Sequence, residues 1–224
     1  MSALDISCVN LFLIKSFSAS AKIALLNSIL SITVRRSLRS QFPPHFSSVC
    51  NDFSKISEIA RYSLSLFESI VDSDTGGYFS GDIPNHGMLV NGAMKVLTAL
   101  DWLNVPIHFP EKLIDTTLSM LPKSDGCHLV DAIYVLHRCA LQTDYKRHKI
   151  KDYFMSVLDM INLHHNNDGG FSYNIGSAQK SYYGLPISKG YNESDIHGTV
   201  LLTWALSMIF CSIESSTHWK IIKP

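Results

Sequence analysis

The stretch His197-Gly-Thr-Val-Leu-Leu-Thr-Trp-Ala-Leu206 decides the fold, because it repeats an earlier part of the chain. It aligns without gaps with Asn91-Gly-Ala-Met-Lys-Val-Leu-Thr-Ala-Leu100, and the two share the glycine and the final Ala-Leu pair. Asp131–Ala140 fits the same register more loosely. Such self-similarity is the sequence signature of a repeat architecture. We therefore expect several copies of one helical unit.

Each copy is predicted to be a pair of helices. Lys149–Leu163 carries apolar residues at the 3.6-residue period of an amphipathic helix, whereas Gly198–Phe210 is apolar on almost every side. A helix of the second kind must be enclosed by other helices, so we expect an outer amphipathic layer and an inner apolar layer. Met88–Leu103 is a second inner helix of this type, and no segment shows a strand-like alternation. Further helices are predicted at Ile6–Phe17, Ala21–Arg39 and Ser54–Val71.

Two glycine turns separate outer from inner helices. Asp74-Thr-Gly-Gly-Tyr-Phe79 resembles Asp168-Gly-Gly-Phe171, and glycine supplies the positive φ that such turns need. Successive helical hairpins of this kind form an open solenoid or a closed α/α toroid. The predicted fold class is therefore all-α, an α/α toroid, complete or incomplete, in one domain over residues 1–224. Its repeats lie in residues 54–213, and residues 1–50 carry the N-terminal helices.

Composition excludes several classes of protein. The chain has 224 residues, of which 46% are hydrophobic and 17% charged, and this apolar content excludes an intrinsically disordered protein. Because 19 basic residues balance 19 acidic ones, nucleic-acid binding is not expected, nor is electrostatic attraction to a membrane surface. The five cysteines include no CxxC pair, which favours a reducing compartment.

The N-terminal region only partly imitates a signal peptide. Asp5 precedes the apolar run Leu11–Ile14, and Lys15 interrupts it. No run reaches the roughly 18 uninterrupted apolar residues of a membrane span. We expect a cytoplasmic protein without a membrane span.

Three segments carry a family resemblance. Asn167-Asp-Gly-Gly-Phe171, Glu193-Ser-Asp-Ile-His-Gly-Thr199 and Trp204-Ala-Leu206 resemble repeats of the terpenoid cyclase and protein prenyltransferase toroids, over residues 54–210. Within that superfamily, the second segment is most similar to toroid proteins encoded with bacterial surface-polysaccharide biosynthesis genes. The resemblance implies a protein that binds or processes a saccharide or lipid-linked saccharide in the toroid cup. It implies no particular reaction, because one fold hosts many activities.

The repeat alignment also predicts a site. Asn91, Asp131 and His197 take the same position near the start of three inner helices, which would place them around one end of a toroid cavity. If the protein is an enzyme, His197 acts as acid or base, since histidine titrates near neutral pH. Asp195 or Asp131 would orient it, and Asn91 would bind substrate. The alternative is purely structural, because Asn and Asp are preferred helix N-caps.

A long connection precedes the third inner helix. The repeat spacing is 40 residues from Asn91 to Asp131 but 66 from Asp131 to His197, so residues 172–194 contain an insertion. Long connections in compact domains are usually functional or disordered, and the tyrosines here favour order. We expect Tyr182 and Tyr183, with Glu193, to contact a sugar ring or a prenyl chain. The alternative is a loop whose tyrosines only anchor it to the helices.

A zinc site is the remaining possibility from the resemblance. Catalytic subunits of protein prenyltransferases resemble this chain in an Asp-Gly-Cys at one inner helix and a His at the next, here Asp125, Cys127 and His197. In the repeat alignment His197 matches Asp131 rather than Cys127, so we expect no metal and no other cofactor. Asp72-Ser-Asp-Thr75 resembles the acid motif of terpenoid cyclases, but it falls in a glycine turn.

Two other functions stay open. One is a prenyltransferase-like or terpenoid-cyclase-like enzyme acting on a prenyl chain. The other is a non-catalytic scaffold that pairs with another helical protein, because an incomplete ring would leave apolar inner-helix surface uncovered. The sequence does not decide whether the protein is an enzyme.

Overall fold

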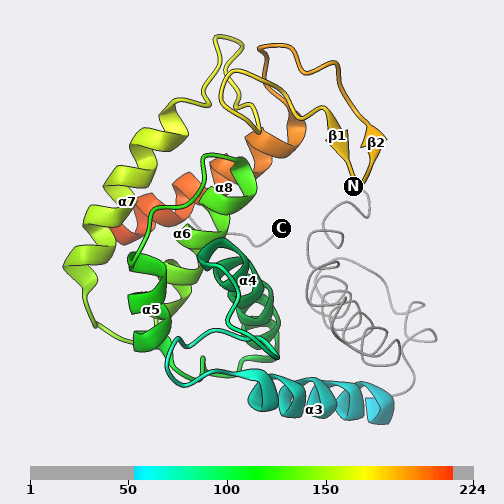
Figure 1. Cartoon of the computed structure of the whole chain (residues 1–224), viewed down its shortest axis with the longest axis vertical. Coiled ribbons are helices and arrows are strands. Elements are labelled where there is room, and N and C mark those ends of the chain that lie inside the picture. Colours follow the sequence, from blue (N-terminus) through cyan, green and yellow to red (C-terminus); the bar gives the residue numbers. More distant parts are fainter. Residues whose placement is uncertain (1–52, 214–224) are drawn as a thin grey trace, which may run out of the picture.

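The structure, a computed structural model, describes residues 53–213, with side chains from residue 60 onward. This part of the chain is mostly helical, as predicted, and it contains one short strand pair (Figure 1). The predicted helices Ile6–Phe17 and Ala21–Arg39 lie outside the described residues. The elements are α3 (Phe53–Ile70), α4 (His86–Leu103), α5 (Pro110–Leu118), α6 (Gly126–Ala140), α7 (Arg147–Asn162), β1 (Ser181–Tyr182), β2 (Leu185–Pro186) and α8 (Ile196–Ile213).

The six described helices form three consecutive hairpins. Helix α6 packs along α4 on one side and along α8 on the other, and α5 and α7 also pack against it. Helices α3, α5 and α7 lie on the outer side of this row (Figure 1). The order of outer and inner helices therefore follows the predicted repeat. Closure of the row into a toroid stays a prediction.

Helix α6 forms the centre of the core. Most of its residues are buried, because neighbouring helices contact it from both layers. Its Arg138 makes an ion pair with Asp101 near the end of α4, which fixes the two inner helices against each other. The fully buried side chains of α6 include Leu129, Val130, Ile133, Val135 and Leu136.

Helix α8 is less enclosed than predicted. Leu202, Ala205 and Met208 are buried, but Val200 is exposed and Ile196 is 84% exposed. The prediction that this helix is enclosed on all sides is wrong for the described residues, because α6 and α7 cover only one side of it. By length and composition alone α8 could cross a membrane, with a mean hydropathy of 1.7 and 28% of its residues buried. Core helices of soluble proteins meet the same criterion.

Both glycine turns have the predicted backbone. Gly76 has φ +71° and Gly169 has φ +88°. Each turn is closed by one antiparallel bridge, Val71 with Tyr78 and His165 with Phe171. Residues 79–85 then lead into α4, whereas residues 172–195 precede α8 and include the β1–β2 hairpin.

Candidate functional site

The starts of α4 and α6 lie side by side. Asn85 caps α4 and Asp125 caps α6, each by accepting a backbone N–H with its side chain. Asn91 and Asp131 are the sixth residues of their helices, and Nδ2 of Asn91 donates to Oδ2 of Asp131 at 2.6 Å. The structure therefore brings together two of the three residues that the repeat alignment groups. The third, His197, is the second residue of α8. The repeat alignment therefore matches residues that lie at different distances from the starts of their helices.

Asn91 also bridges two buried charged groups. Nζ of Lys95 donates to Oδ1 of Asn91 at 2.8 Å, and the side chains of both Lys95 and Asp131 are buried. Burying opposite charges requires that both be paired and hydrogen-bonded. The amide of Asn91 thus ties α4 to α6 and fixes the Asp131 carboxylate in one orientation.

His128 and Asp125 form a second pair at the start of α6. Nδ1 of His128 lies 2.6 Å from Oδ2 of Asp125, whose other oxygen accepts the backbone N–H of His128. The hydrogen bond to Asp125 raises the pKa of His128 above its usual value. Burial opposes ionisation of Asp125, but the hydrogen bonds from His128 outweigh it and lower the pKa of Asp125. With Nδ1 committed to Asp125, Nε2 is the nitrogen left for a ligand.

A pocket of about 270 Å³ lies between these two helix starts. Gly87 leaves room for the His128 ring, because a Cβ at this position would come within 3.3 Å of Nε2. The pocket therefore presents an imidazole and a carboxylate that can exchange hydrogen bonds with the hydroxyl groups of a small ligand. Its polar lining residues are Asn85, His86, Lys123, His128 and Asp131.

His197 lies in a cluster built by the long connection. Its Nδ1 is 2.7 Å from Oε1 of Gln179. The Tyr173 ring stacks on the imidazole, with centroids 5.1 Å apart and planes 13° apart, and Tyr182 approaches it edge-on at 5.5 Å. A neutral amide, rather than a carboxylate, therefore orients this imidazole at Nδ1.

Tyr173 connects the two clusters. Its hydroxyl donates to Oδ1 of Asp125 at 3.3 Å, while its ring stacks on His197. Burial raises the pKa of Tyr173 well above its ordinary value, so the hydroxyl stays protonated and remains a donor. The starts of α6 and α8 are thus joined in one continuous polar and aromatic surface that runs from His128 to His197.

Asp195 positions the long connection. Its Oδ1 accepts the N–H of Gly198 at 2.7 Å, in the first turn of α8. Its Oδ2 accepts the N–H of Tyr173 at 2.8 Å and that of Gln179 at 3.0 Å. Asp195 therefore places Tyr173 and Gln179, two of the three residues that contact the His197 ring, and acts on His197 through them.

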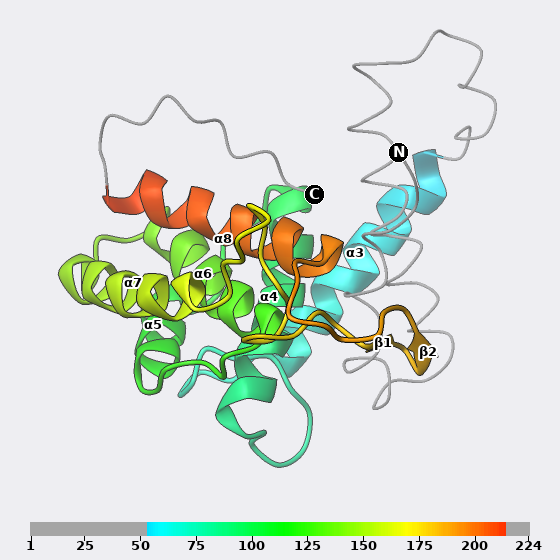
Figure 2. The same ribbon diagram turned by 90° about the horizontal axis from the view of Figure 1, so that it is seen from above.

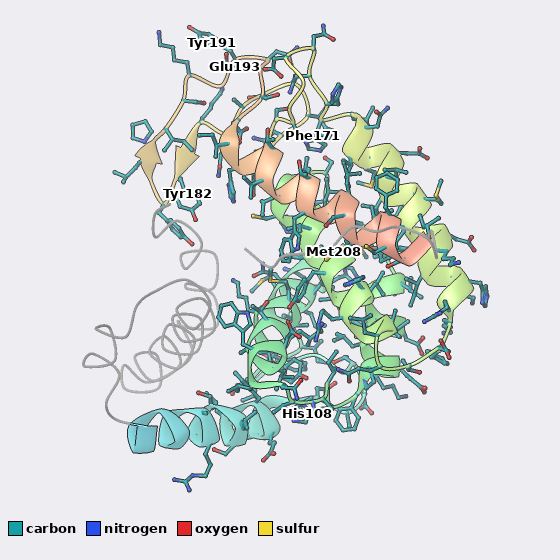
Figure 3. All side chains as sticks on the ribbon, turned by 180° about the vertical axis from the view of Figure 1, so that it is seen from behind. His108, Phe171, Tyr182, Tyr191, Glu193 and Met208 are labelled. Carbon is teal, nitrogen blue, oxygen red and sulfur yellow. The ribbon has the colours of Figure 1, made fainter. Side chains whose placement is uncertain are left out.

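The two tyrosines of the hairpin lie beside this cluster, whereas Glu193 does not. Tyr183 has φ +48° and Gly184 φ +81°, the backbone of a tight two-residue hairpin turn. The Tyr183 ring meets Tyr182 edge-on at 4.5 Å. Figure 3 shows Glu193 at the opposite end of the connection from Tyr182.

Cys127 and His197, two of the three candidate zinc ligands, take equivalent positions in their helices. Cys127 and His197 are both second residues, of α6 and α8, so the register argument against zinc does not hold in the structure. Asp125, however, is engaged with His128 and Tyr173. Among residues 53–213, no group of three or more His, Cys, Asp or Glu side chains is placed to hold a metal ion.

Sequence reasoning missed three residues of these clusters, His128, Lys95 and Gln179. The Asp-x-x-His spacing could have indicated both a helix start and the Asp125–His128 pair, because an N-cap and the residue three positions later meet. No pattern in the sequence indicates Gln179, since its position depends on the path of the whole connection.

Comparison with known protein families, curated proteins and solved structures gives no match to this chain.

Proposed function

We propose that the protein binds a saccharide or lipid-linked saccharide in bacterial surface-polysaccharide biosynthesis. The ligand would lie in the cup of an α/α toroid, at the starts of the inner helices. The observation that carries the proposal is the position of Tyr173, which joins the His128 pocket to the aromatic His197 cluster. The resemblance of the repeats to toroid proteins of polysaccharide biosynthesis supports it.

The chemistry of this surface suits a sugar. A pyranose ring has an apolar C–H face and a rim of hydroxyl groups. Tyrosine rings pack against such faces while their hydroxyls form hydrogen bonds, and the Tyr182–Tyr183 pair offers partly exposed rings. Asp131 and His128 offer acceptors and donors for the hydroxyl groups. At about 270 Å³, the pocket suits one small ring of a larger ligand.

If the bound saccharide is also processed, two histidines can move a proton. The hydrogen bond to Asp125 raises the pKa of His128, which makes His128 a stronger base than an ordinary histidine. Oε1 of Gln179 accepts the Nδ1–H of His197, which leaves Nε2 of the neutral imidazole as a hydrogen-bond acceptor for the ligand. The addition of His128 extends the sequence-based proposal, in which His197 alone acts as acid or base.

The proposal is tested by ligand-induced thermal stabilisation. The purified full chain is heated with neutral and acidic oligosaccharides, with polyprenyl phosphate and with zinc. A ligand at 100 times its Kd stabilises the folded state by about 2.7 kcal/mol. We expect a saccharide to raise the Tm, and His197→Ala to abolish the increase. His148→Ala is the matched control, because this histidine is exposed on α7. A saccharide effect that survives His197→Ala, or no saccharide effect at all, contradicts the proposal.

One observation favours a second function, that of a scaffold for another helical protein. The side of α8 that carries Ile196 and Val200 is exposed in the described structure, as an inner helix that needs a partner would be. In that case Val200→Asp would abolish the complex with the partner and leave the saccharide effect on Tm unchanged.

A further inference from the structure

The β1–β2 hairpin presents an exposed apolar surface. We call Tyr183, Leu185 and Ile187 the hairpin patch; they are 52%, 68% and 53% exposed. Tyr182 pairs with Leu185, and the N–H of Ile187 donates to the carbonyl of Lys180. Figure 2 shows the hairpin projecting away from α6 and α7. Soluble proteins seldom gather large apolar side chains on a projecting element without an interaction that covers them.

Two lysines flank the hairpin in sequence. Lys180 and Lys189 are both exposed, and residues 172–192 contain no Asp or Glu. The aliphatic part of Lys180 lies over Gly190, where a side chain would collide with it, and Nζ of Lys189 lies 5.9 Å from the centroid of the Tyr191 ring. The nearest acidic residues in sequence are Asp195, which accepts three backbone N–H groups, and Glu193, which lies away from Tyr182 (Figure 3).

The backbone of the hairpin does not favour a protein strand as its partner. Pro186 lies in β2 and has no N–H to offer to a further strand. Both strands have two residues, too few for a ladder with another chain. An apolar tip, a tyrosine and flanking lysines instead match the boundary between the acyl chains and the headgroups of an anionic bilayer.

We propose that the hairpin patch docks the protein peripherally on an anionic lipid bilayer. Leu185 and Ile187 enter the headgroup region, and Lys180 and Lys189 contact anionic headgroups. The overall charge of zero does not oppose this, because both lysines lie in residues 172–192, which contain no Asp or Glu. Leu185 shares a face of the hairpin with Tyr182, whose ring contacts His197. Docking therefore brings the His197 cluster next to the headgroups, where a lipid-linked saccharide would be presented; this last point alone rests on the proposed function.

Sedimentation with vesicles tests the proposal. The full chain is mixed with vesicles of phosphatidylcholine alone, or with phosphatidylglycerol added. We expect binding to the anionic vesicles and at least a tenfold loss of affinity in Leu185→Ser/Ile187→Ser. Leu141→Ser/Leu163→Ser is the matched control, because these leucines are 62% and 60% exposed outside the hairpin, and it should bind like the wild type. Lys180→Ala and Lys189→Ala should each weaken binding about fivefold on anionic vesicles only.

Two results would overturn the proposal. One is a wild-type chain that does not sediment with either kind of vesicle. The other is a Leu185→Ser/Ile187→Ser variant that binds as the wild type does, or that changes only the oligomeric mass in light scattering. The saccharide-induced increase in Tm is measured on the same variants. It should persist in all of them, so failure of membrane docking is distinguished from failure of saccharide binding.

Discussion

The two glycine turns start alike and then diverge. Gly76 lies in a buried turn, and the carbonyl of Thr75 there accepts the Thr116 hydroxyl of α5 at 2.7 Å. Gly169 lies in an exposed turn, and the neighbouring Asp168 accepts the N–H and the hydroxyl of Ser194, at the far end of the long connection. The first turn therefore fixes one helical hairpin to the next. The second holds the two ends of a loop together.

This difference indicates how a repeat acquires a site. The repeated Gly-Gly-aromatic turn specifies where the outer helix stops. The segment after the turn differs between the two hairpins, and in the third hairpin it places Gln179, Tyr173 and Tyr182 around His197. The first turn packs against a neighbouring helix, whereas the second joins the ends of the long connection. The same substitution should therefore change the stability of the fold by different amounts in the two turns.

The largest difference is expected between Gly76→Ala and Gly169→Ala. Both residues have positive φ, which costs an alanine about 1 kcal/mol. At Gly76 the new Cβ would also lie 2.6 Å from the backbone N of Leu113, whereas at Gly169 no atom lies within 4 Å. We expect a loss of about 3 kcal/mol or more at Gly76 and about 1 kcal/mol at Gly169. Urea unfolding of the two variants measures this, and equal losses would show that the turns are packed alike.

The next largest difference in stability is expected between substitutions of the N-caps of α4 and α8. Asn85 caps α4 with one hydrogen bond from Met88, so Asn85→Ala should cost about 1 kcal/mol. Asp195→Ala leaves three backbone N–H groups without their acceptor, so we expect a loss of about 2–3 kcal/mol. Hydrogen exchange locates the effect. Faster exchange in Asp195→Ala should be confined to residues 172–198, and uniform acceleration over all helices would contradict the positioning role of Asp195.

Substitution of Asp125 should change the titration of His128. Asp125 raises the pKa of His128 above its ordinary 6.5, so the folded chain holds this proton more tightly than the unfolded chain. The stabilisation is fully present below about pH 6.5 and is lost as pH rises through the folded-state pKa. Because both side chains are partly exposed, the effect should stay below about 1 kcal/mol. NMR titration of the histidine rings should show a lower pKa for His128 in Asp125→Asn, and an unchanged value would exclude the pair.

The smallest effect is expected in the hairpin turn. Asparagine tolerates positive φ better than tyrosine, so Tyr183→Asn should stabilise the chain by about 0.5 kcal/mol. The same variant should weaken vesicle binding and the saccharide effect on Tm, because it removes the exposed ring. If the variant is more stable but binds vesicles and saccharide as the wild type does, Tyr183 contributes to neither interaction.

The sequence predicted the helices well and the site only in part. Apolar periodicity locates α4, α7 and α8 to within a few residues, because helix faces are set by local spacing. The enclosure of α8 was mispredicted, since its surroundings depend on which helices pack beside it. The repeat alignment grouped Asn91 with Asp131, which are in contact, but it also added His197. That alignment matched Gly92 with Gly198 and took no account of where each helix begins, which Asn85, Asp125 and Asp195 decide.

Asp125 couples ligand binding at the tyrosines to protonation of His128. Its carboxylate receives the Tyr173 hydroxyl on one oxygen and the His128 imidazole on the other. A ligand that draws Tyr173 away leaves more negative charge for the imidazole and so increases its proton affinity. By linkage, protonation of His128 must then favour that ligand by the same factor. Ligand binding at the tyrosines near neutral pH should therefore take up a fraction of a proton, which appears in calorimetry as a binding enthalpy that depends on the buffer.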